Sequence, residues 1–494
     1  MPVVFMVAEK PMLAHSIAKI LSNNGARDRK GWNGACPVIE YEGSFRGKPA
    51  HFKMTSTCGH VMDCDKEGEN ICFEVIDAIR HVIRLAPDDS NIFRAKFSAI
   101  SAKDINEAMR NLGRPNVNES LSVDARQELD LRIGCAFTRF QTKFFHSKYG
   151  DLDSSLVSFG PCQTPTLGFC VARYDQIQSF KPESYWVLQV SASHEKSDLK
   201  LEWSRSRLFD KDACHLFADR VKNAKEVFIT DVSSEKRYKG RPAALNTVEL
   251  MRIASSGLGM APSHCMSIAE QLYTQGFISY PRTETTQYPQ NFDARSLVKE
   301  LESDAVLGPL ASLTLSSGLH AARKGCDVGD HPPITPMKCD STRRLSGDQF
   351  RLFEYIVQHF LATVTADEDF FLSGRVVLVP GFTAILNWTS VDDSNDDTKL
   401  PADLTIGQKL KISDVKVIER ETTAPDYLTE SELISLMEQH GIGTDASIPV
   451  HINNICQRNY VTVSSSGRKL IPTRLEHNSL EVKADLRRGK KLKR

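Results

Sequence analysis

A tyrosine and an arginine stand two residues apart in the segment Ser279-Tyr280-Pro281-Arg282-Thr283-Glu284-Thr285. A phenol has a pKa of ~10 and is a weak nucleophile at neutral pH unless a nearby cation stabilises its oxyanion. Pro281 fixes its own φ and favours an extended Tyr280, so the side chains of Tyr280 and Arg282 can point to the same side. The pattern predicts a tyrosine that attacks a phosphate. A half-buried strand tyrosine before a turn is the alternative.

Three carboxylates alternate along Asp63-Cys64-Asp65-Lys66-Glu67-Gly68-Glu69. In an extended segment Asp63, Asp65 and Glu67 share one face, and carboxylate oxygens are the ligands that a hard divalent ion such as Mg²⁺ prefers. Apolar residues at helical spacing follow this segment, which therefore precedes a packed helix. The pattern indicates a metal site, with a solvated acidic turn as the alternative.

The N-terminus predicts a strand, a loop and a helix. Val3 to Val7 reads as a buried strand that ends at Glu9 and Lys10, and Pro11 fits the first turn of a helix with an apolar stripe. Ligands gather at the carboxyl ends of strands in α/β sheets, so Glu9 and Lys10 lie where chemistry is expected. A structural acid and a surface lysine are the open alternative.

A long helix is predicted to begin near Ser122, with Leu129 and Phe140 on its apolar face. Arg126 and Arg132 are expected outside this apolar face. Arg126 and Asp130 are spaced for an i, i+4 ion pair, which the sequence favours over direct contact with phosphate.

A turn-rich polar loop, residues 158–166, follows this helix. Ser158, Gln163 and Thr164 could offer hydroxyl groups and amide hydrogens to a phosphate backbone. Taken by itself, the loop is a weak indication of nucleic-acid binding.

Composition is that of an ordinary folded protein, with 494 residues, 41% hydrophobic and 25% charged. Lysine plus arginine equals aspartate plus glutamate, so any basic surface must be local. Twelve cysteines include no Cys-x-x-Cys pair, which excludes a zinc ribbon and favours reduced thiols. No apolar run approaches the ~18 residues of a membrane span, and no basic leader is present, so we expect neither a membrane protein nor an exported one.

Two stretches, from about Tyr185 to Ile229 and from about Phe370 to Ile418, alternate apolar and polar residues as strands of one split antiparallel domain would. A mainly helical insert with Tyr280 lies between them. Near the C-terminus, a capping box at residues 429–432 opens a helix, a second helix covers 448–458, and 460–471 reads as a hairpin. This order resembles a winged helix, which either binds nucleic acid or serves as a packing element.

Four motifs carry a resemblance to a known family. They are Val7-Ala8-Glu9-Lys10-Pro11, Asp63-Cys64-Asp65-Lys66-Glu67-Gly68-Glu69, Ser279-Tyr280-Pro281-Arg282-Thr283-Glu284-Thr285 and His440-Gly441-Ile442-Gly443-Thr444-Asp445-Ala446-Ser447. Together they resemble the type IA DNA topoisomerases, and their order and identity match the eukaryotic topoisomerase III beta branch. The resemblance runs from Met1 to about Pro472.

The resemblance implies a multidomain α/β plus α+β fold in a toroidal arrangement. The expected parts are a Toprim-like α/β domain at 1–113, a winged-helix-like DNA-binding domain at 114–178 and 424–472, a β-rich hinge domain at 179–244 and 368–423, a helical domain with the nucleophile at 245–367, and a basic, disordered tail at 473–494.

The resemblance also implies roles for single residues. Tyr280 would attack a single-strand phosphodiester and form a 5′-phosphotyrosine link, Arg282 would stabilise that phosphate, and Lys10 would assist. Glu9 would donate a proton to the leaving 3′ oxygen, and His331 would contact the phosphate. The metal acids would be Asp63, Asp65 and Glu67. The nucleic-acid interface would include Arg126, Asp130, Arg132, Ser158, Gln163, Thr164, Gly443, Thr444 and Ser447.

The implied activity is cutting and rejoining of single-stranded DNA without ATP, for relaxation and decatenation in recombination and repair. Mg²⁺ is the expected cofactor, with neither ATP nor zinc, and no P-loop is present in the sequence. The implied partners are single-stranded DNA, RNA as a second substrate that the beta branch can use, and a RecQ-type helicase or an adaptor protein. The basic tail favours a nuclear location, with the cytoplasm as the alternative.

Two departures from the family pattern indicate a shortened Toprim domain and a truncated C-terminus. The family has several tens of residues, ending in an apolar strand, between the pair matched by Gly59-His60 and the first metal acid, whereas Met62 here precedes Asp63 directly. A sheet without that strand would have to use Thr55 to Met62, which makes a poor buried strand. The family also continues past Pro472. A catalytically impaired, nucleic-acid-binding variant of the same scaffold is therefore the alternative function.

Overall fold

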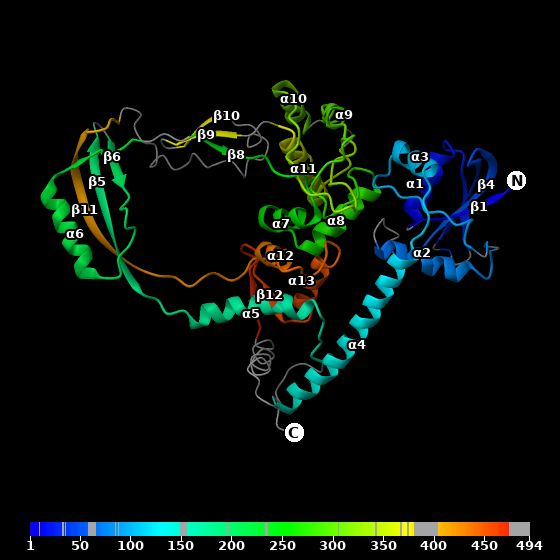
Figure 1. Ribbon diagram of the computed structural model, residues 1–494, viewed down its shortest axis with the longest axis horizontal. Coiled ribbons are helices and arrows are strands. Elements are labelled where there is room, and N and C mark those ends of the chain that lie inside the picture. The colour runs from blue at the N-terminus through cyan, green and yellow to red at the C-terminus, as the bar shows by residue number, and fades with distance from the viewer. Residues whose placement is uncertain are drawn as a thin grey trace. The chain divides into compact units, whose positions relative to one another are not determined.

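The computed structural model describes residues 1–8, 10–31, 34, 36–57, 66–83, 85–86, 88–148, 156–194, 197–232, 236–304, 306–340, 343–365, 368–372, 375–379 and 404–473. Glu9, Asp63, Asp65 and the basic tail beyond residue 473 lie outside this set. The chain forms two compact units (Figure 1): the first contains residues 1–170, 242–364 and those from 429 onward, and the second contains 171–241 and 365–428. Among the described helices, none is long and apolar enough to cross a membrane.

The first unit begins with a four-stranded sheet in the order β1-β4-β3-β2. Its strands are β1 (Val3–Ala8), β2 (Arg27–Lys30), β3 (Pro37–Phe45) and β4 (Lys48–Ser56). Strand β1 runs parallel to β4, and the other neighbours are antiparallel. Helix α1 (Pro11–Leu21) has its proline in the first turn and buries Leu13 and Ile17 against Phe52 and Met54. The predicted strand and helix are confirmed, but the expectation of a buried strand is wrong, because Val3 and Phe5 on one face of β1 are exposed.

Strand β1 lies at the edge of this sheet, and within the described parts of the chain it pairs only with β4. Of the segment Thr55 to Met62, only Thr55 and Ser56 are in a strand, and residues 58–62 lie outside the described residues. Alternate β1 side chains pack towards α1, whereas Val3 and Phe5 on the opposite face are 60% and 41% exposed. An apolar strand edge of this kind is a template for pairing with another chain.

We therefore expect Phe5→Glu to reduce concentration-dependent self-association, measured by light scattering. Phe5 is opposite Lys53 in the register of β1 and β4, so the new carboxylate gains a cross-strand partner and the sheet should keep its stability. Leu216→Glu is the matched control, because Leu216 is 56% exposed on a helix instead of a strand edge. A larger decrease for Leu216→Glu than for Phe5→Glu would contradict the role of the edge.

Three helices follow the sheet: α2 (Lys66–Ile79), α3 (Ala102–Arg110) and α4 (Val117–Lys148). Helix α4 begins at Val117 and not near Ser122, because the side chain of Asn116 accepts the Asn118 N–H and caps it. Helix α2 packs on α4 through the buried amide of Asn70, which donates to Asp124 Oδ1 at 2.7 Å. Beyond this contact, Leu129 and Phe140 on the predicted apolar face of α4 are exposed.

The second unit contains two antiparallel sheets. The larger has the order β6-β5-β11-β7, and its strands are β5 (Ser184–His194), β6 (Ser197–Leu201), β7 (Glu226–Phe228) and β11 (Lys409–Glu421). Helix α6 (Lys211–Ala224) packs on it. The smaller sheet consists of β8 (Lys236–Lys239), β9 (Glu368–Leu372) and β10 (Arg375–Val379). Residues 184–193 pair with 411–421, which joins the two stretches that the sequence predicts as one split β region.

The insert is helical, as predicted. Its helices are α7 (Thr247–Leu258), α8 (Pro262–Thr274), α9 (Ala294–Leu301), α10 (Gly308–Ser317) and α11 (Gly347–Thr363). Asn246 caps α7, Gly259 ends it with a φ of +68°, and a proline opens α8. Helix α11 is buried along most of its length and packs against α8, so the insert has a core of its own.

The last described elements are α12 (Glu430–Gln439), α13 (Ile448–Gln457), β12 (Val461–Val463) and β13 (Leu470–Pro472). The capping box is confirmed, since Thr429 and Glu432 exchange side-chain to backbone hydrogen bonds. Leu433 and Ile452 form a core with Leu167 of α5 (Gln163–Ser179) and Met251 of α7. The helix, turn, helix and hairpin order is therefore as the sequence predicts.

Candidate active site around Tyr280

Tyr280 lies where three segments meet. Its N–H donates to the carbonyl of Ser98 at 2.9 Å, and the N–H of the preceding Ser279 donates to Thr335 O at 2.9 Å. The first partner belongs to the loop between α2 and α3, and the second to the loop before α11. These bonds fix the Tyr280 backbone between the two loops.

The Tyr280 side chain is buried in this conformation. Its ring centroid is 4.4 Å from that of His331 and 5.1 Å from that of Tyr273. A phosphate group from solution can therefore reach the phenol only after the surrounding segments separate. The site as folded is closed.

Arg282 and Lys10 share one carboxylate. Arg282 Nη2 donates to Glu270 Oε1 on α8, and Lys10 Nζ lies 3.9 Å from Glu270 Oε2. The two cations predicted to act on one phosphate therefore lie together, although they are far apart in the chain. A phosphate that entered here would compete with Glu270 for both.

His331 is buried beside Tyr280, and its two ring nitrogens differ. Nδ1 is 2.8 Å from Ser98 Oγ, whereas Nε2 is buried and has no hydrogen-bond partner among the described residues. Burial lowers the pKa of His331 from 6.5 to about 4, and the charges of Arg94 and Lys96 act in the same direction while Asp330 opposes them. The imidazole is therefore neutral at pH 7, with one nitrogen available to a ligand.

The loop after Tyr280 is held from both sides. Thr247 Oγ1 donates to Pro281 O at 2.8 Å and accepts the Thr283 N–H at 2.7 Å. Asp330, next to His331, accepts the Glu284 N–H at 2.7 Å. These bonds fix the position of Arg282 relative to the histidine loop.

Of the three predicted metal-binding acids, Asp63, Asp65 and Glu67, the structure describes only Glu67. It lies in the first turn of α2 and is half-exposed, and Arg126 Nη2 is 2.8 Å from its Oε1. Within the described ranges, no three histidine, cysteine or acidic side chains are grouped as metal ligands. The donor set of Asp63, Asp65 and Glu67 consists of carboxylates alone, which suits Mg²⁺.

Glu69, two residues further on, has a different role. It is 1% exposed, accepts the Asn116 N–H at 2.6 Å, and forms an ion pair at 3.1 Å with Arg94, which is 12% exposed. Arg94 also contributes positive potential at His331. This buried pair connects α2 to the loop that carries Ser98.

The residues predicted on α4 pair differently from expectation. Arg126 contacts Glu67, so the predicted i, i+4 ion pair with Asp130 is wrong; the fold brings a closer carboxylate from α2. Arg132 forms an i, i+4 pair with Glu128. Burial lowers the pKa of His451 on α13 and the exposed Asp130 opposes this, so Asp130 lies within electrostatic reach of α13.

The polar loop before α5 contacts the hairpin region. Ser158 N–H donates to Tyr460 Oη at 3.1 Å, and Arg458 Nη1 donates to both Ser158 Oγ and Gln163 Oε1. Thr164 lies in the first turn of α5. Ser158 and Gln163 therefore have structural partners that a phosphate would have to share or replace.

The turn before α13 carries Gly443, Thr444 and Ser447. Gly443 has a φ of +83°, and a Cβ there would lie 3.1 Å from Ser447 Oγ, so glycine is required. Ser447 Oγ accepts the Thr444 N–H at 2.8 Å. Asp445 in this turn lies within electrostatic reach of Arg282 and Glu284, which brings the fourth motif to the Tyr280 site.

Asp445 makes a pH-dependent prediction. Burial raises its pKa from 3.8 to about 6, Glu284 and Asp330 act in the same direction, and the Ala446 N–H and Arg282 oppose them. Because the folded pKa lies above the unfolded value, this group stabilises the fold below pH ~4, and the contribution is lost as pH rises through ~6. We expect Asp445→Asn to be more stable than the wild type at pH 7.5, by about 2 kcal/mol, and the difference to fall to about a third of that at pH 4.5.

The measurement is hydrogen exchange in peptides from α12 and α13 at the two pH values, with Asp219→Asn, an exposed position on α6, as the control. Equal gains for both variants at both pH values would contradict the assignment to Asp445.

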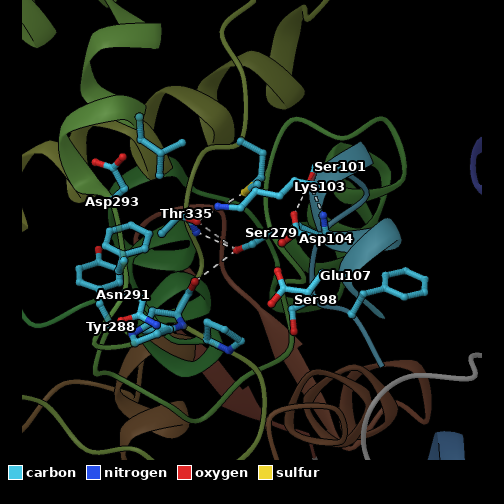
Figure 2. A pocket seen from close by; sticks show the side chains of 18 of the residues that line it. Ser98, Ser101, Lys103, Asp104, Glu107, Ser279, Tyr288, Asn291, Asp293 and Thr335 are labelled. Carbon is cyan, nitrogen blue, oxygen red and sulfur yellow. Dashed lines mark hydrogen bonds between the residues drawn. The ribbon is translucent and has the colours of Figure 1, made fainter. Parts of the chain in front are cut away.

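A cavity of about 840 Å³ lies next to this site (Figure 2). Its lining includes Ser98, whose carbonyl binds the Tyr280 N–H, and Ser279, which precedes Tyr280. Helix α3 contributes Lys103 and Glu107, and the loop before α9 contributes Asn291. The lining carries both signs of charge, so it does not select an anion by charge alone.

Comparison with known proteins shows which family the chain belongs to. A family model described as DNA topoisomerase matches residues 114–482. The mouse protein DNA topoisomerase 3-beta-1 is 50% identical over 98% of this chain, and the Drosophila melanogaster protein DNA topoisomerase 3-beta is 49% identical over 96%. The chain belongs to the type IA DNA topoisomerases. Its resemblance to the topoisomerase III beta branch is thereby confirmed.

Among solved structures, full-length topoisomerase I of Thermotoga maritima superposes with a TM-score of 0.67 at 18% identity, covering 99% of this chain and 87% of that one. This similarity supports the fold alone, as a multidomain α/β topoisomerase. The chain spans 64% of the length of the mouse relative and 61% of the Drosophila one. The mouse alignment covers 560 positions, 66 more than the 494 residues here, so that topoisomerase has residues without a counterpart in this chain.

Four residues around these topoisomerase motifs were not predicted: Ser98, Glu270, Arg94 and Arg458. Glu270 lies on an ordinary helix and Ser98 in an ordinary loop. No spacing in the sequence marks either, because their partners are distant in the chain.

Proposed function

We propose that this chain is an ATP-independent type IA topoisomerase that cuts and rejoins one DNA strand through a 5′-phosphotyrosine at Tyr280. The convergence of Tyr280, His331, Arg282 and Lys10 around one closed site carries the proposal. A buried phenol beside a neutral histidine, with two cations nearby, supplies a nucleophile and groups that can stabilise charge during attack on a phosphodiester.

In the proposed step, Tyr280 Oη forms a bond to phosphorus, and the bond from phosphorus to the 3′ oxygen of the upstream nucleotide breaks. The phenol releases its proton to water, and the leaving 3′ oxygen takes up a proton from Glu9, the proposed donor. The phosphodiester is exchanged and not hydrolysed, so rejoining is the reverse step and no nucleotide is consumed.

Arg282 and Lys10 would turn from Glu270 to the phosphate and stabilise its developing charge. His331 Nε2 would donate to the same phosphate. Asp63, Asp65 and Glu67 would hold Mg²⁺, which when bound supplies positive charge near the DNA backbone. Glu67 contacts Arg126 in this structure. When Mg²⁺ binds to Glu67, Arg126 would either move away or remain as a positive charge beside the metal.

The test uses one oligonucleotide labelled at either end. With Mg²⁺ and after denaturation, a 3′-labelled strand should yield a covalent protein adduct and a 5′-labelled strand a free shortened fragment. Tyr280→Phe should abolish both products. Tyr273→Phe, at a buried tyrosine in edge contact with Tyr280, is the matched control and should retain them. Free ends without any adduct would instead indicate a hydrolase.

A catalytically impaired variant that only binds single strands is the second candidate. Its support is that β1 pairs only with β4 within the described parts of the chain, and that at least 66 positions of the mouse alignment have no counterpart here. Strand binding without an adduct under any divalent ion would select it.

The remaining proposals concern the substrates, partners and location of the protein in the cell. Single-stranded DNA is the proposed main substrate, with RNA as a second class, and roles in recombination and repair with a RecQ-type helicase or an adaptor protein follow from the family. A nuclear location is proposed, which fluorescence microscopy of the tagged chain can test.

A further inference from the structure

Ser98 makes two hydrogen bonds to the active site from a separate part of the fold. Its carbonyl accepts the Tyr280 N–H at 2.9 Å, and its hydroxyl is 2.8 Å from His331 Nδ1. The loop that carries it is anchored at Arg94, which exchanges two backbone hydrogen bonds with Gly113 at 3.0 and 2.9 Å. Ser98 is therefore held in place independently of the residues that it contacts.

Because His331 is neutral, only one of its two ring nitrogens carries a hydrogen, and which one decides whether Nε2 can donate to a phosphate. A neutral imidazole carries one N–H, and the tautomer is set by the partner of the other nitrogen. With the hydrogen on Nδ1, the ring would donate to Ser98 and leave Nε2 as a bare acceptor, which repels a phosphate oxygen. With the Ser98 hydroxyl as donor, Nε2 carries the hydrogen and can donate.

Two observations favour the second arrangement. Ser98 Oγ lies 2.8 Å from Nδ1 and has no other hydrogen-bond partner among the described residues, so its hydroxyl hydrogen is free to be donated to Nδ1. Nε2 is buried and has no partner there, and the neighbouring ring is that of Tyr280, where the phosphate would bind. With a phosphate bound, an acceptor oxygen beside Nε2 favours an N–H on that nitrogen, whereas in the closed site a buried N–H without a partner is costly.

We propose that Ser98 is a positioning residue that donates to His331 Nδ1, holds the ring as its Nε2–H tautomer, and so directs one N–H to the phosphate that Tyr280 attacks. This role rests on the proposed function. The carbonyl of Ser98 also holds the Tyr280 backbone, so one loop contacts both the nucleophile segment and the histidine.

The direct test is nuclear magnetic resonance of protein labelled with ¹⁵N-histidine, with the His331 signals assigned through His331→Gln. In the wild type, Nε2 should be protonated and Nδ1 not. Ser98→Ala should give a mixture of tautomers, and Ser98→Thr, which keeps the hydroxyl, should restore the wild-type pattern. A wild-type ring protonated on Nδ1 would overturn the proposal without touching the proposed function.

The kinetic test is single-turnover adduct formation on the 3′-labelled strand. Ser98→Ala should slow the step about tenfold while strand affinity stays unchanged, and Ser98→Thr should recover most of the rate. Ser296→Ala is the matched control, because its hydroxyl lines the same cavity but bonds to Asp293. An equal loss in Ser98→Thr and Ser98→Ala would overturn the positioning role. Absence of any wild-type adduct would contradict the proposed function, and the resonance experiment would still decide the tautomer.

The charged groups that face His331 are Asp330, Arg94 and Lys96. With the pKa of the ring lowered to about 4, the wild-type rate should not follow histidine protonation above pH 5.5. A dependence of the Ser98→Ala to wild-type rate ratio on pH between 6 and 8 would contradict a neutral ring.

Discussion

Replacement of Glu69 by Gln is expected to lower the local stability of the N-terminal part by about 3 kcal/mol, whereas Glu67→Gln should cost less than about 0.5 kcal/mol. The two glutamates belong to one acidic motif and differ in surroundings. Glu69 is buried and paired with Arg94, and Glu67 is half-exposed and paired with Arg126. Loss of Glu69 leaves the Arg94 charge buried without its carboxylate.

Hydrogen exchange followed by mass spectrometry is the suitable measurement, because a chain of two units does not have a single unfolding free energy. Peptides from α2 and from the loop that contains Arg94 should lose roughly a hundredfold in protection in Glu69→Gln. Peptides from α6 in the second unit should be unchanged. The double variant Glu69→Gln with Arg94→Gln should cost less than the two single changes added together, since neither charge is then left alone.

Equal protection in Glu69→Gln and Glu67→Gln would contradict this distinction between the two acids. It would mean that water reaches Arg94 in solution. The consequence reaches the active site, because Arg94 anchors the loop that places Ser98 against His331.

The sequence predicts well what neighbouring residues determine. The apolar stripe of α1 and the capping box of α12 are local patterns of spacing, and both are present. The start of α4 is the exception, because the cap is Asn116, six residues before the predicted start at Ser122.

Contacts across the chain were beyond prediction. Arg126 is four residues from Asp130 yet contacts Glu67, because packing of α2 on α4 brings that acid closer. Ser98 and His331 are separated by 233 positions. A serine in a loop has many possible partners, and only the folded chain selects one. The four motifs could be recognised, but the groups that connect them could not.

Arg282→Ala is expected to reduce adduct formation about a hundredfold, the effect of removing a donor that stabilises charge in the transition state. Arg282→Lys should keep most of the activity if charge alone is needed. Arg252→Ala is the matched control, because Arg252 forms a similar ion pair with Glu249 on α7 without belonging to the site. Rates of adduct formation and affinities for the same strand should be measured together.

Glu270→Gln should strengthen the binding of the DNA strand, whereas Arg282→Ala should weaken the reaction. In the closed site Glu270 holds Arg282 and lies 3.9 Å from Lys10 Nζ, so it competes with phosphate for both cations. Its neutralisation should tighten strand binding about threefold to tenfold at low salt, and the gain should shrink as salt screens the charges. Weaker binding in Glu270→Gln would show instead that the carboxylate orients the two cations, and the arginine would then depend on Glu270 for its position as the histidine depends on Ser98.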